Sequence, residues 1–251
     1  MAESSITRVK QNFWQILSLI LIELAILLLY IFVMDKGIVP YKYDSFSTIA
    51  LELFCLFVFI AINRFVFKQP IFHPTKNLYR NLLLLLPAYL YLLYGVFSVF
   101  ENYVLPSNLI IYFLTAITTA ISEEYLFRGL ILARLLSTSK TTIFPLIVTS
   151  LLFGTMHLIH LFDQSFFTTL NQVIQVSFVG FTLGTLYLVT HSIYFPIVLH
   201  ATLDLVPFIL IDTSGGSSDS WMSTFIYSLI YLLISLAYYL IYRIDRGVKK
   251  I

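Results

Sequence analysis

Residues 13–34 read FWQILSLILIELAILLLYIFVM, an apolar run with a single charged residue, Glu23. At 1.5 Å per residue, a helix of this length crosses a hydrocarbon core about 30 Å thick. Comparable apolar runs recur at about 46–66, 81–100, 107–136, 142–161, 170–190, 193–211 and 221–243. They lack the alternation of barrel strands, and a helix satisfies its own backbone hydrogen bonds in lipid. The sequence therefore predicts an all-α polytopic membrane protein of about eight transmembrane helices in one bundle.

The composition agrees with a chain that is solvated mainly by lipid. Hydrophobic residues make up 59% of the sequence and charged residues only 11%, too few to cover the surface of a soluble domain of this length. Cys55 is the single cysteine, so an intrachain disulfide is impossible. We expect one membrane domain over residues 1–251 and no soluble domain.

The basic residues between the runs predict the orientation, because Lys and Arg in short loops concentrate on the cytoplasmic side. With the N-terminus inside, the inner set is Arg8, Lys10, Arg64, Lys68, Lys76, Arg80, Arg134, Lys140, Arg243, Arg246, Lys249 and Lys250. The outer set contains only Lys36 and Lys42, while Asp35, Asp44, Glu101, Asp163, Asp212 and Asp219 are also outside. Both termini are therefore predicted to be cytoplasmic, and the composition favours a bacterial cell membrane.

Residues 122–129, SEEYLFRG, hold the strongest polar cluster within a predicted span. A central charge costs about 2.5–3.5 kcal/mol on insertion scales, so such residues usually face the bundle interior and mark function. Glu124 and Arg128 are four residues apart, in the favourable order for an ion pair on one helix face. Glu123 points about 100° away from that face. It must therefore be protonated or meet a group from another helix, which suits a general acid or base.

Two further motifs place histidines within predicted spans. Residues 153–157 read FGTMH, and the small Gly154 allows a neighbouring helix to approach close to His157, a plausible partner for Glu123. His160 is interpreted as an ordinary interfacial residue. His200 and Asp204 form an i, i+4 pair that could bind a metal, relay protons or donate hydrogen bonds to an oxyanion.

Three other features of the predicted spans are less specific. Glu23 and Glu52 each stand alone in a run, and the sequence does not separate a bracing hydrogen bond from a place in a polar cavity. Gly180 and Gly184 have the G-x-x-x-G spacing that lets two helix backbones approach, which predicts packing and no chemistry.

Glu-Glu-x-x-x-Arg, Phe-x-x-x-His and His-x-x-x-Asp, in this order on successive late helices, resemble the CAAX prenyl endopeptidase and bacteriocin-processing family of intramembrane proteases, called CPBP. The similarity covers about Ser122 to Asp204, within a catalytic region expected at about 107–211. The resemblance implies an intramembrane endopeptidase that cleaves a membrane-associated protein or peptide.

The resemblance also implies roles for the motif residues. Glu123 and His157 would activate the hydrolytic water, and His200 with Asp204 would form the oxyanion side. Glu124 and Arg128 would hold the site together. We expect no cofactor. Zinc stays open, because Glu123, His157 and His200 could supply three ligands and leave a position for water.

The sequence is also compatible with functions other than proteolysis. A catalytically inactive CPBP-fold scaffold, or an immunity or regulatory protein, would carry the same helices, and a proton-coupled transporter also places acids and histidines near the midplane. The sequence has no internal repeat, which argues against a transporter. In a bacterium, peptide processing, export or bacteriocin immunity is a more plausible role than trimming of prenylated proteins. The expected partners are the lipid bilayer and a membrane-associated substrate, with no nucleic acid.

The depths of the two motif histidines conflict if the helices are upright. His200 is about 10 Å from the cytoplasmic start of its predicted span, whereas His157 is about 22 Å from the start of its own. Helix tilt, a kink at Pro196 or different helix ends must bring them together. The resemblance favours a cavity open to the cytoplasmic side.

Overall fold

The computed structural model describes residues 2–35, 46–102, 108–214 and 220–248, and these residues form helices and connections without a β-strand. The helices are α1 (Ala2–Asp35), α2 (Phe46–Ile62), η1 (Asn63–Phe67), α3 (Leu78–Leu83), α4 (Leu86–Asn102), α5 (Leu109–Glu124), η2 (Tyr125–Leu132), α6 (Ala133–Thr138), α7 (Ile143–Met156), η3 (His157–Phe162), α8 (Phe166–Thr190), α9 (Tyr194–Ser214) and α10 (Trp221–Val248). Of these, η1 and η2 are π-helical and η3 is a 3₁₀ helix. The all-α fold predicted from the sequence is confirmed.

Six helical stretches of the described chain are long and apolar enough to cross a membrane. They are Lys10–Val33, Phe46–Phe67, Leu109–Thr138, Ile143–Phe162, Phe166–Thr190 and Trp221–Gly247. The two other predicted runs also form helices, but the apolar part of α9, Tyr194–Leu210, is shorter and α4 has 17 residues. A polytopic membrane protein is therefore confirmed, and eight is an approximate count of its spans.

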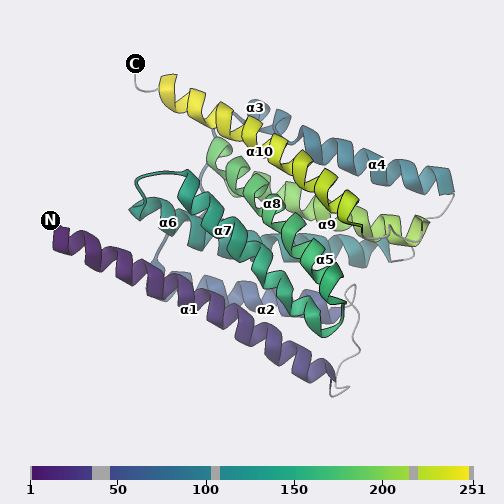
Figure 1. Cartoon of the computed structure of the whole chain (residues 1–251), viewed down its shortest axis with the longest axis horizontal. Helices are drawn as coiled ribbons and strands as arrows, with labels where there is room; N and C mark the ends of the chain where they lie inside the picture. Colours follow the sequence, from purple (N-terminus) through teal and green to yellow (C-terminus); the bar gives the residue numbers. More distant parts are fainter. Residues whose placement is uncertain (1, 36–45, 103–107, 215–219, 249–251) are drawn as a thin grey trace.

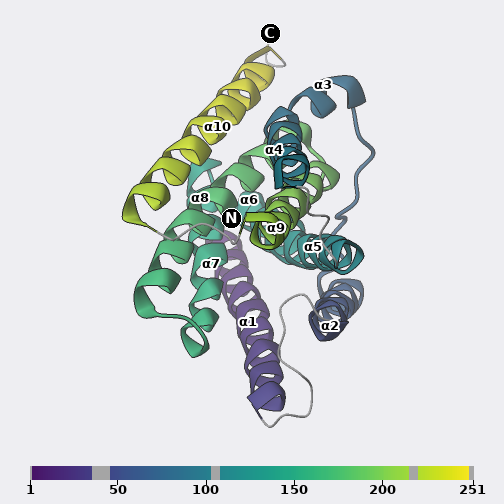
Figure 2. The ribbon, with the colours of Figure 1, turned by 90° about the vertical axis from the view of Figure 1, so that its right-hand side faces the viewer.

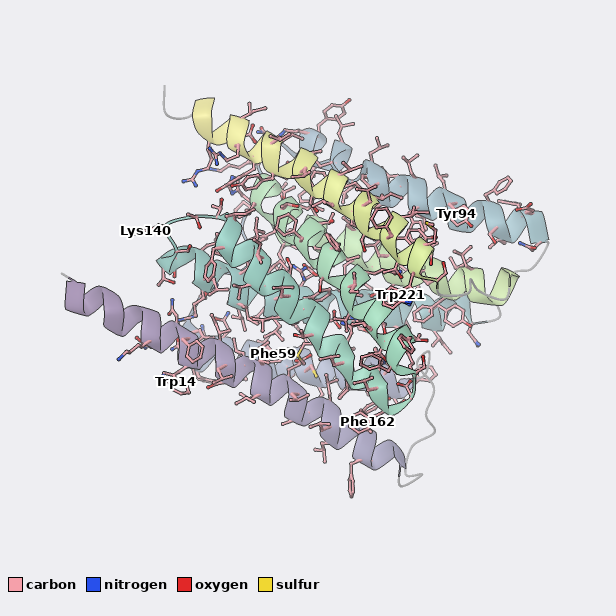
Figure 3. The ribbon with its side chains drawn as sticks, in the orientation of Figure 1. Trp14, Phe59, Tyr94, Lys140, Phe162 and Trp221 are labelled. Atoms are coloured by element: carbon pink, nitrogen blue, oxygen red, sulfur yellow. The ribbon has the colours of Figure 1, made fainter. Side chains whose placement is uncertain are left out.

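The outer surface of the bundle is apolar, as lipid solvation requires. Figure 3 shows large side chains projecting outward from α1 and α4, among them Trp14 and Tyr94, which are 63% and 55% exposed. Phe59 of α2, in contrast, is fully buried in the core. Since apolar side chains are stable in lipid, this surface needs no polar cover.

Close packing of small residues joins α7 to α8. A Cβ atom at Gly180 would lie 3.2 Å from the Cα of Ser150, and one at Gly184 would lie 2.8 Å from a methyl group of Leu146. Both glycines therefore face α7, and their spacing serves helix packing as predicted. On its other side α8 contacts α10, where the hydroxyls of Thr182 and Ser235 are 2.8 Å apart.

Both α1 and α10 have their chain ends at the same end of the bundle, here called the terminal end (Figure 1). Polar contacts at this end join distant segments: Arg80 of α3 pairs with Asp245 of α10 at 2.5 Å, and Arg134 of α6 bonds to Gln15 of α1 at 2.5 Å. Lys36, Lys42, Asp44, Asp219, Lys249 and Lys250 lie outside the described residues, as do the side chains of Arg8, Asp35 and Asp212. The described basic residues of the predicted inner set thus gather at the terminal end.

Residues 68–77, here called the closing loop, fold against the bundle at the terminal end. Ile71 is 5% exposed and packs on Gly129, whose Cβ position would be 3.0 Å from an Ile71 methyl group. The side-chain amide of Asn63 donates to the Gln69 carbonyl at 2.9 Å, and that of Gln69 donates to the Gly129 carbonyl at 2.5 Å. Phe72 contacts the ring of Tyr125. The loop therefore covers η2, and Figure 2 shows its trace leading up to α3.

Candidate active site

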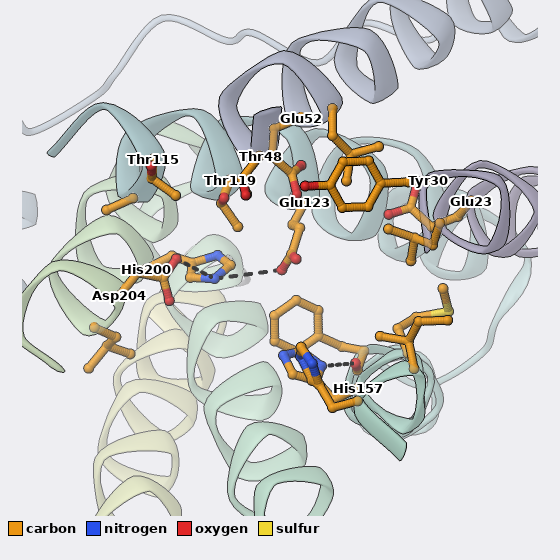
Figure 4. Close-up of a pocket in the computed structure, with 18 of the residues that line it drawn as sticks. Glu23, Tyr30, Thr48, Glu52, Thr115, Thr119, Glu123, His157, His200 and Asp204 are labelled. Atoms are coloured by element: carbon orange, nitrogen blue, oxygen red, sulfur yellow. Dashed lines mark hydrogen bonds and ion pairs between the residues drawn. The ribbon is translucent and has the colours of Figure 1, made fainter. Parts of the chain in front are cut away.

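Five helical segments surround a cavity of about 560 Å³ in the middle of the bundle (Figure 4). Its polar lining comes from residues far apart in the sequence: Glu23, Tyr30, Thr48, Glu52, Thr115, Thr119, Glu123, His157, His160, Asp163, His200 and Asp204. Among the described residues that line it there is no Lys or Arg. A cavity of this size, largely apolar with converging polar groups, is typical of a binding or active site.

Glu124, Arg128 and His200 form a chain of interactions behind the cavity wall. Arg128 donates to the Glu124 carboxylate at 2.7 Å, and both side chains are buried. A second Arg128 nitrogen donates to the Gly180 carbonyl at 2.9 Å, which fixes the guanidinium against α8. The Nδ1 atom of His200 lies 2.9 Å from the same Glu124 oxygen. The ion pair predicted from the i, i+4 spacing therefore exists and fixes the imidazole of another helix.

Phe153 of α7 is the ring around which the site is assembled. Its centroid lies 4.6 Å from the Arg128 guanidinium, 5.6 Å from the ring of His157 and 5.6 Å from the ring of His200. Phe127 packs edge-on against it at 5.0 Å. An aromatic face attracts a cation, and such edge contacts fix ring positions. The sequence motif gave Phe153 no role of its own, and its role in the structure is to hold these groups in place.

Glu123, His200 and Asp204 meet at one wall of the cavity. With Nδ1 engaged by Glu124, the Nε2 atom of His200 faces Glu123 at 3.7 Å and Asp204 at 3.5 Å. The Glu123 and Asp204 side chains are 21% and 30% exposed, so both are open to the cavity. The unpaired Glu123 of the sequence thus meets a group from another helix, and that group is His200.

His157 lies on the α7 side of the same cavity. Its Nδ1 atom is 3.2 Å from the Phe153 carbonyl, and its ring lies 5.8 Å from the ring of His160. Figure 4 shows the His157 and Glu123 side chains reaching into the same space from two helices. Glu123 and His157 therefore line one cavity, but the imidazole that faces Glu123 at 3.7 Å is that of His200 and not that of His157, the partner suggested by the sequence.

The depth conflict between the two histidines is resolved by the start of α9. The connection from α8 to α9 is short and lies inside the protein: Thr190, Ser192 and Ile193 are all at least 97% buried. The asparagine side chain of Asn81 and the hydroxyl of Thr75 contact this connection. Helix α9 therefore begins below the surface at the terminal end, which carries His200 to the level of Phe153 without a kink at Pro196.

The helical span predicted at about 107–136 is present as Leu109–Thr138, and within it residues 125–132 are π-helical. All eight of these residues are buried, so tertiary packing compensates for the weaker local geometry. The Tyr125 hydroxyl meets Asn63 at 3.0 Å, and the Gly129 carbonyl accepts a hydrogen bond from the closing loop. π-Helical turns occur frequently at functional sites, and this one directly follows the two glutamates.

The residues named as possible zinc ligands do not fit a zinc site as they are placed. No group of three or more His, Cys, Asp or Glu side chains among the described residues converges in a way that could hold a metal ion. His200 engages Nδ1 with Glu124 and His157 engages Nδ1 with the Phe153 carbonyl, so only Nε2 of each ring is left for a metal ion.

Glu23 and Glu52, which the sequence left undecided, line the cavity from α1 and α2. Both interact electrostatically with Glu123. The only sequence signal for this arrangement was their position inside apolar runs, because the motifs do not reveal which early helices adjoin the late ones.

The cavity lies in the part of the bundle remote from the chain termini. Helix α1 contributes residues from Glu23 onward, α2 contributes Thr48, Leu51 and Glu52 from its first turns, and α9 contributes residues from His200 onward. In each case these are the parts of the helices remote from the terminal end (Figure 1). The closing loop and the buried start of α9 lie on the other side.

Residues 105–206 match the family model described as type II CAAX prenyl endopeptidase Rce1-like. Over this segment the chain matches the CAAX protease family. The recognition made from the three motifs is therefore confirmed, and the match contains the Glu123, His157 and His200 positions. The family supports protease activity in general and a membrane-associated substrate. No curated protein and no solved structure matches the chain.

Proposed function

We propose that this protein is an intramembrane endopeptidase that hydrolyses a peptide bond of a membrane-associated peptide or protein without a metal ion. The observation that carries the proposal is the Arg128–Glu124–His200 chain. It fixes the His200 imidazole so that Nε2 faces the cavity 3.7 Å from the Glu123 carboxyl. A buried arginine and two glutamates at this depth are costly in a membrane, which favours a functional role.

In the proposed reaction, Glu123 acts as general base on a water molecule and His157 helps to position that water. The activated water attacks the carbonyl carbon of the scissile bond, and the proton taken up by Glu123 passes to the leaving amine. His200 stabilises the oxyanion through an Nε2–H donor. A donor at Nε2 requires protons on both ring nitrogens, and the carboxyl groups of Glu123, Glu124 and Asp204 around the ring stabilise that positive charge.

The proposed substrate enters from the extracytoplasmic side. Two expectations from the sequence conflict, because the cavity lies nearer the end opposite the termini while the basic residues predict that the termini are cytoplasmic. The distribution of basic residues is read directly from this sequence, whereas the expectation of a cavity open to the cytoplasm came only from the family resemblance. The distribution of basic residues therefore has more weight. We therefore propose cytoplasmic termini and an outward-facing cavity. Peptide processing at a bacterial cell surface, including bacteriocin maturation or immunity, fits this orientation.

Substitution of the proposed base tests the reaction. Purified Glu123→Gln and His157→Ala proteins should lose at least ~100-fold in cleavage of membrane-associated peptides while keeping the helical content and thermal stability of the wild type. Glu101→Gln and His191→Ala are matched controls, since both residues are exposed and lie outside the cavity lining. Full activity of either cavity variant would contradict the mechanism. A folded wild type without turnover would favour the inactive scaffold or regulatory alternative.

Cysteine labelling tests the orientation. In a Cys55→Ala background, Phe166→Cys places a thiol near the cavity end and Lys140→Cys places one at the terminal end, and both positions are exposed. In intact cells a membrane-impermeant maleimide should label the first and not the second. The reverse pattern would place the cavity mouth in the cytoplasm.

A further inference from the structure

We propose that Glu23 and Glu52 form a subsite that binds a basic side chain, Lys or Arg, of the peptide substrate close to the scissile bond. This inference rests on the proposed endopeptidase function and adds a preference in substrate sequence. The two glutamates come from α1 and α2, outside residues 105–206 that match the protease family.

Glu23 has no structural role that explains its position. It is 7% exposed, and its buried Oε2 atom has no hydrogen-bond partner among the residues that the structure describes. Figure 4 shows its carboxyl directed into the cavity, near Tyr30. Buried polar groups are nearly always hydrogen-bonded, so an unpartnered carboxyl facing a cavity indicates a partner that arrives with a ligand. A glutamate that only braced helices would bond to a neighbouring helix.

Glu52 brings a second carboxyl to the same wall. Its side chain hydrogen-bonds to Ser122 of α5, and it interacts electrostatically with both Glu23 and Glu123. Two ionised carboxyls that interact in this way repel one another, and a cation bound between them relieves the repulsion. The described cavity lining contains no Lys or Arg that could act as this cation. Arg128 is committed to Glu124 and to the Gly180 carbonyl on the far side of Phe153.

A basic side chain fits both the chemistry and the size of this space. Lys carries three donors and Arg five, enough to pair with both carboxyls. The remaining lining is mostly apolar, including Leu27, Ile31 and Leu51 beside the glutamates, and accommodates the methylene stem of either residue. A cavity of about 560 Å³ holds a short peptide segment rather than a single side chain. A metal ion is a poorer fit, because no three described side chains converge as ligands.

Selectivity between two nearly isosteric peptides tests the subsite. Quenched-fluorescent apolar heptapeptides with Lys, Arg, norleucine or Glu at successive positions are presented in vesicles of phosphatidylglycerol and phosphatidylethanolamine. The wild type should favour Lys or Arg over norleucine by tenfold or more in kcat/KM at one position. That ratio should fall to about 1 in Glu23→Gln/Glu52→Gln, with intermediate values for the single variants, and stay unchanged in Glu101→Gln.

Charge reversal and N-terminal blocking distinguish the subsite from a bracing role of the glutamates and from recognition of the peptide N-terminus. Glu23→Lys should invert the preference toward the Glu-containing peptide, which loss of a merely structural contact does not predict. Acetylation of the peptide N-terminus should leave the preference intact. Equal ratios in wild type and double variant, or a preference that disappears on acetylation, would overturn the inference.

A binding measurement separates failure of this inference from failure of the proposed function. The full-length Glu123→Gln protein should bind the Lys peptide at least tenfold more tightly than the norleucine peptide in fluorescence anisotropy, and addition of Glu23→Gln/Glu52→Gln should remove the difference. If the wild type cleaves no peptide, the proposed function fails while this binding result still decides the subsite. Equal affinities for both peptides would refute the subsite even in an active protease.

Discussion

The buried ion pair between Glu124 and Arg128 gives the sharpest prediction of stability. Arg128→Met removes the 2.7 Å bond to Glu124, the 2.9 Å bond to the Gly180 carbonyl and the contact with the Phe153 ring. It also leaves an uncompensated carboxyl in a fully buried position. Removal of one partner from a buried pair costs about 3–5 kcal/mol. We expect a loss of this size in the free energy of unfolding, and a similar loss for Glu124→Gln.

The double variant decides whether the loss comes from the pair itself. In Glu124→Gln/Arg128→Met neither side chain is charged, so the loss should be at least about 2 kcal/mol smaller than the sum of the single losses. Arg80→Met is the matched control. Its pair with Asp245 is about one-third exposed on both sides, so its removal should cost about 0–1 kcal/mol.

Unfolding by sodium dodecyl sulfate in mixed micelles, followed by far-ultraviolet circular dichroism, measures these free energies. Tryptophan emission is a poor reporter here, because Trp14 and Trp221 are 63% and 52% exposed on the outer surface of the bundle. Single and double losses that add within about 0.5 kcal/mol would show that the two residues act independently. That result would refute the interpretation of the Arg128–Glu124–His200 chain as one unit.

Three further predictions concern packing, the oxyanion side and metals. Gly154→Ala should lower the free energy of unfolding by about 1–3 kcal/mol, because its Cβ would lie 2.8 Å from the Val173 carbonyl. Gly247→Ala is the control, since its Cβ meets nothing within 4 Å, and it should be neutral or stabilising. Equal effects of the two substitutions would contradict tight α7–α8 packing. Asp204→Asn should retain activity, since an amide donates directly to an oxyanion, and a loss of ~100-fold would instead assign Asp204 to orienting His200. Exhaustive chelation should leave activity intact, and loss restored by zinc would contradict the metal-free mechanism.

The fold class and the local ion pair could be predicted from the sequence because both depend on short-range rules. Apolar run length is set by the thickness of the bilayer, and the i, i+4 spacing of Glu124 and Arg128 places both on one helix face. Two features could not be predicted: the contact between His200 and Glu124, and the π-helical segment that follows Glu124. They depend on how deeply α9 begins in the bundle and on contacts that the closing loop makes with Gly129.

The role of the early helices was the other gap. Glu23 and Glu52 are conspicuous in their apolar runs, but nothing in a single sequence indicates which helices are neighbours across the bundle. A lone glutamate can brace a helix or line a cavity with the same local pattern. Only the packing of α2 on α5, with α1 beside α2, shows that both carboxyls reach the space that holds Glu123.

The closing loop covers η2 at the terminal end, and η2 contributes Phe127 to the lining of the cavity. Because Ile71 and Gln69 pack on η2 and cover it from the terminal end, we expect reactants and products to use the opposite end of the cavity. In a hydrolase with this arrangement, the hydrolytic water must be in the cavity before the peptide binds. The cleaved fragments must leave by the route through which the substrate entered. A product fragment that stays bound in this entrance excludes the next substrate, so product inhibition in such a protease is expected to be competitive.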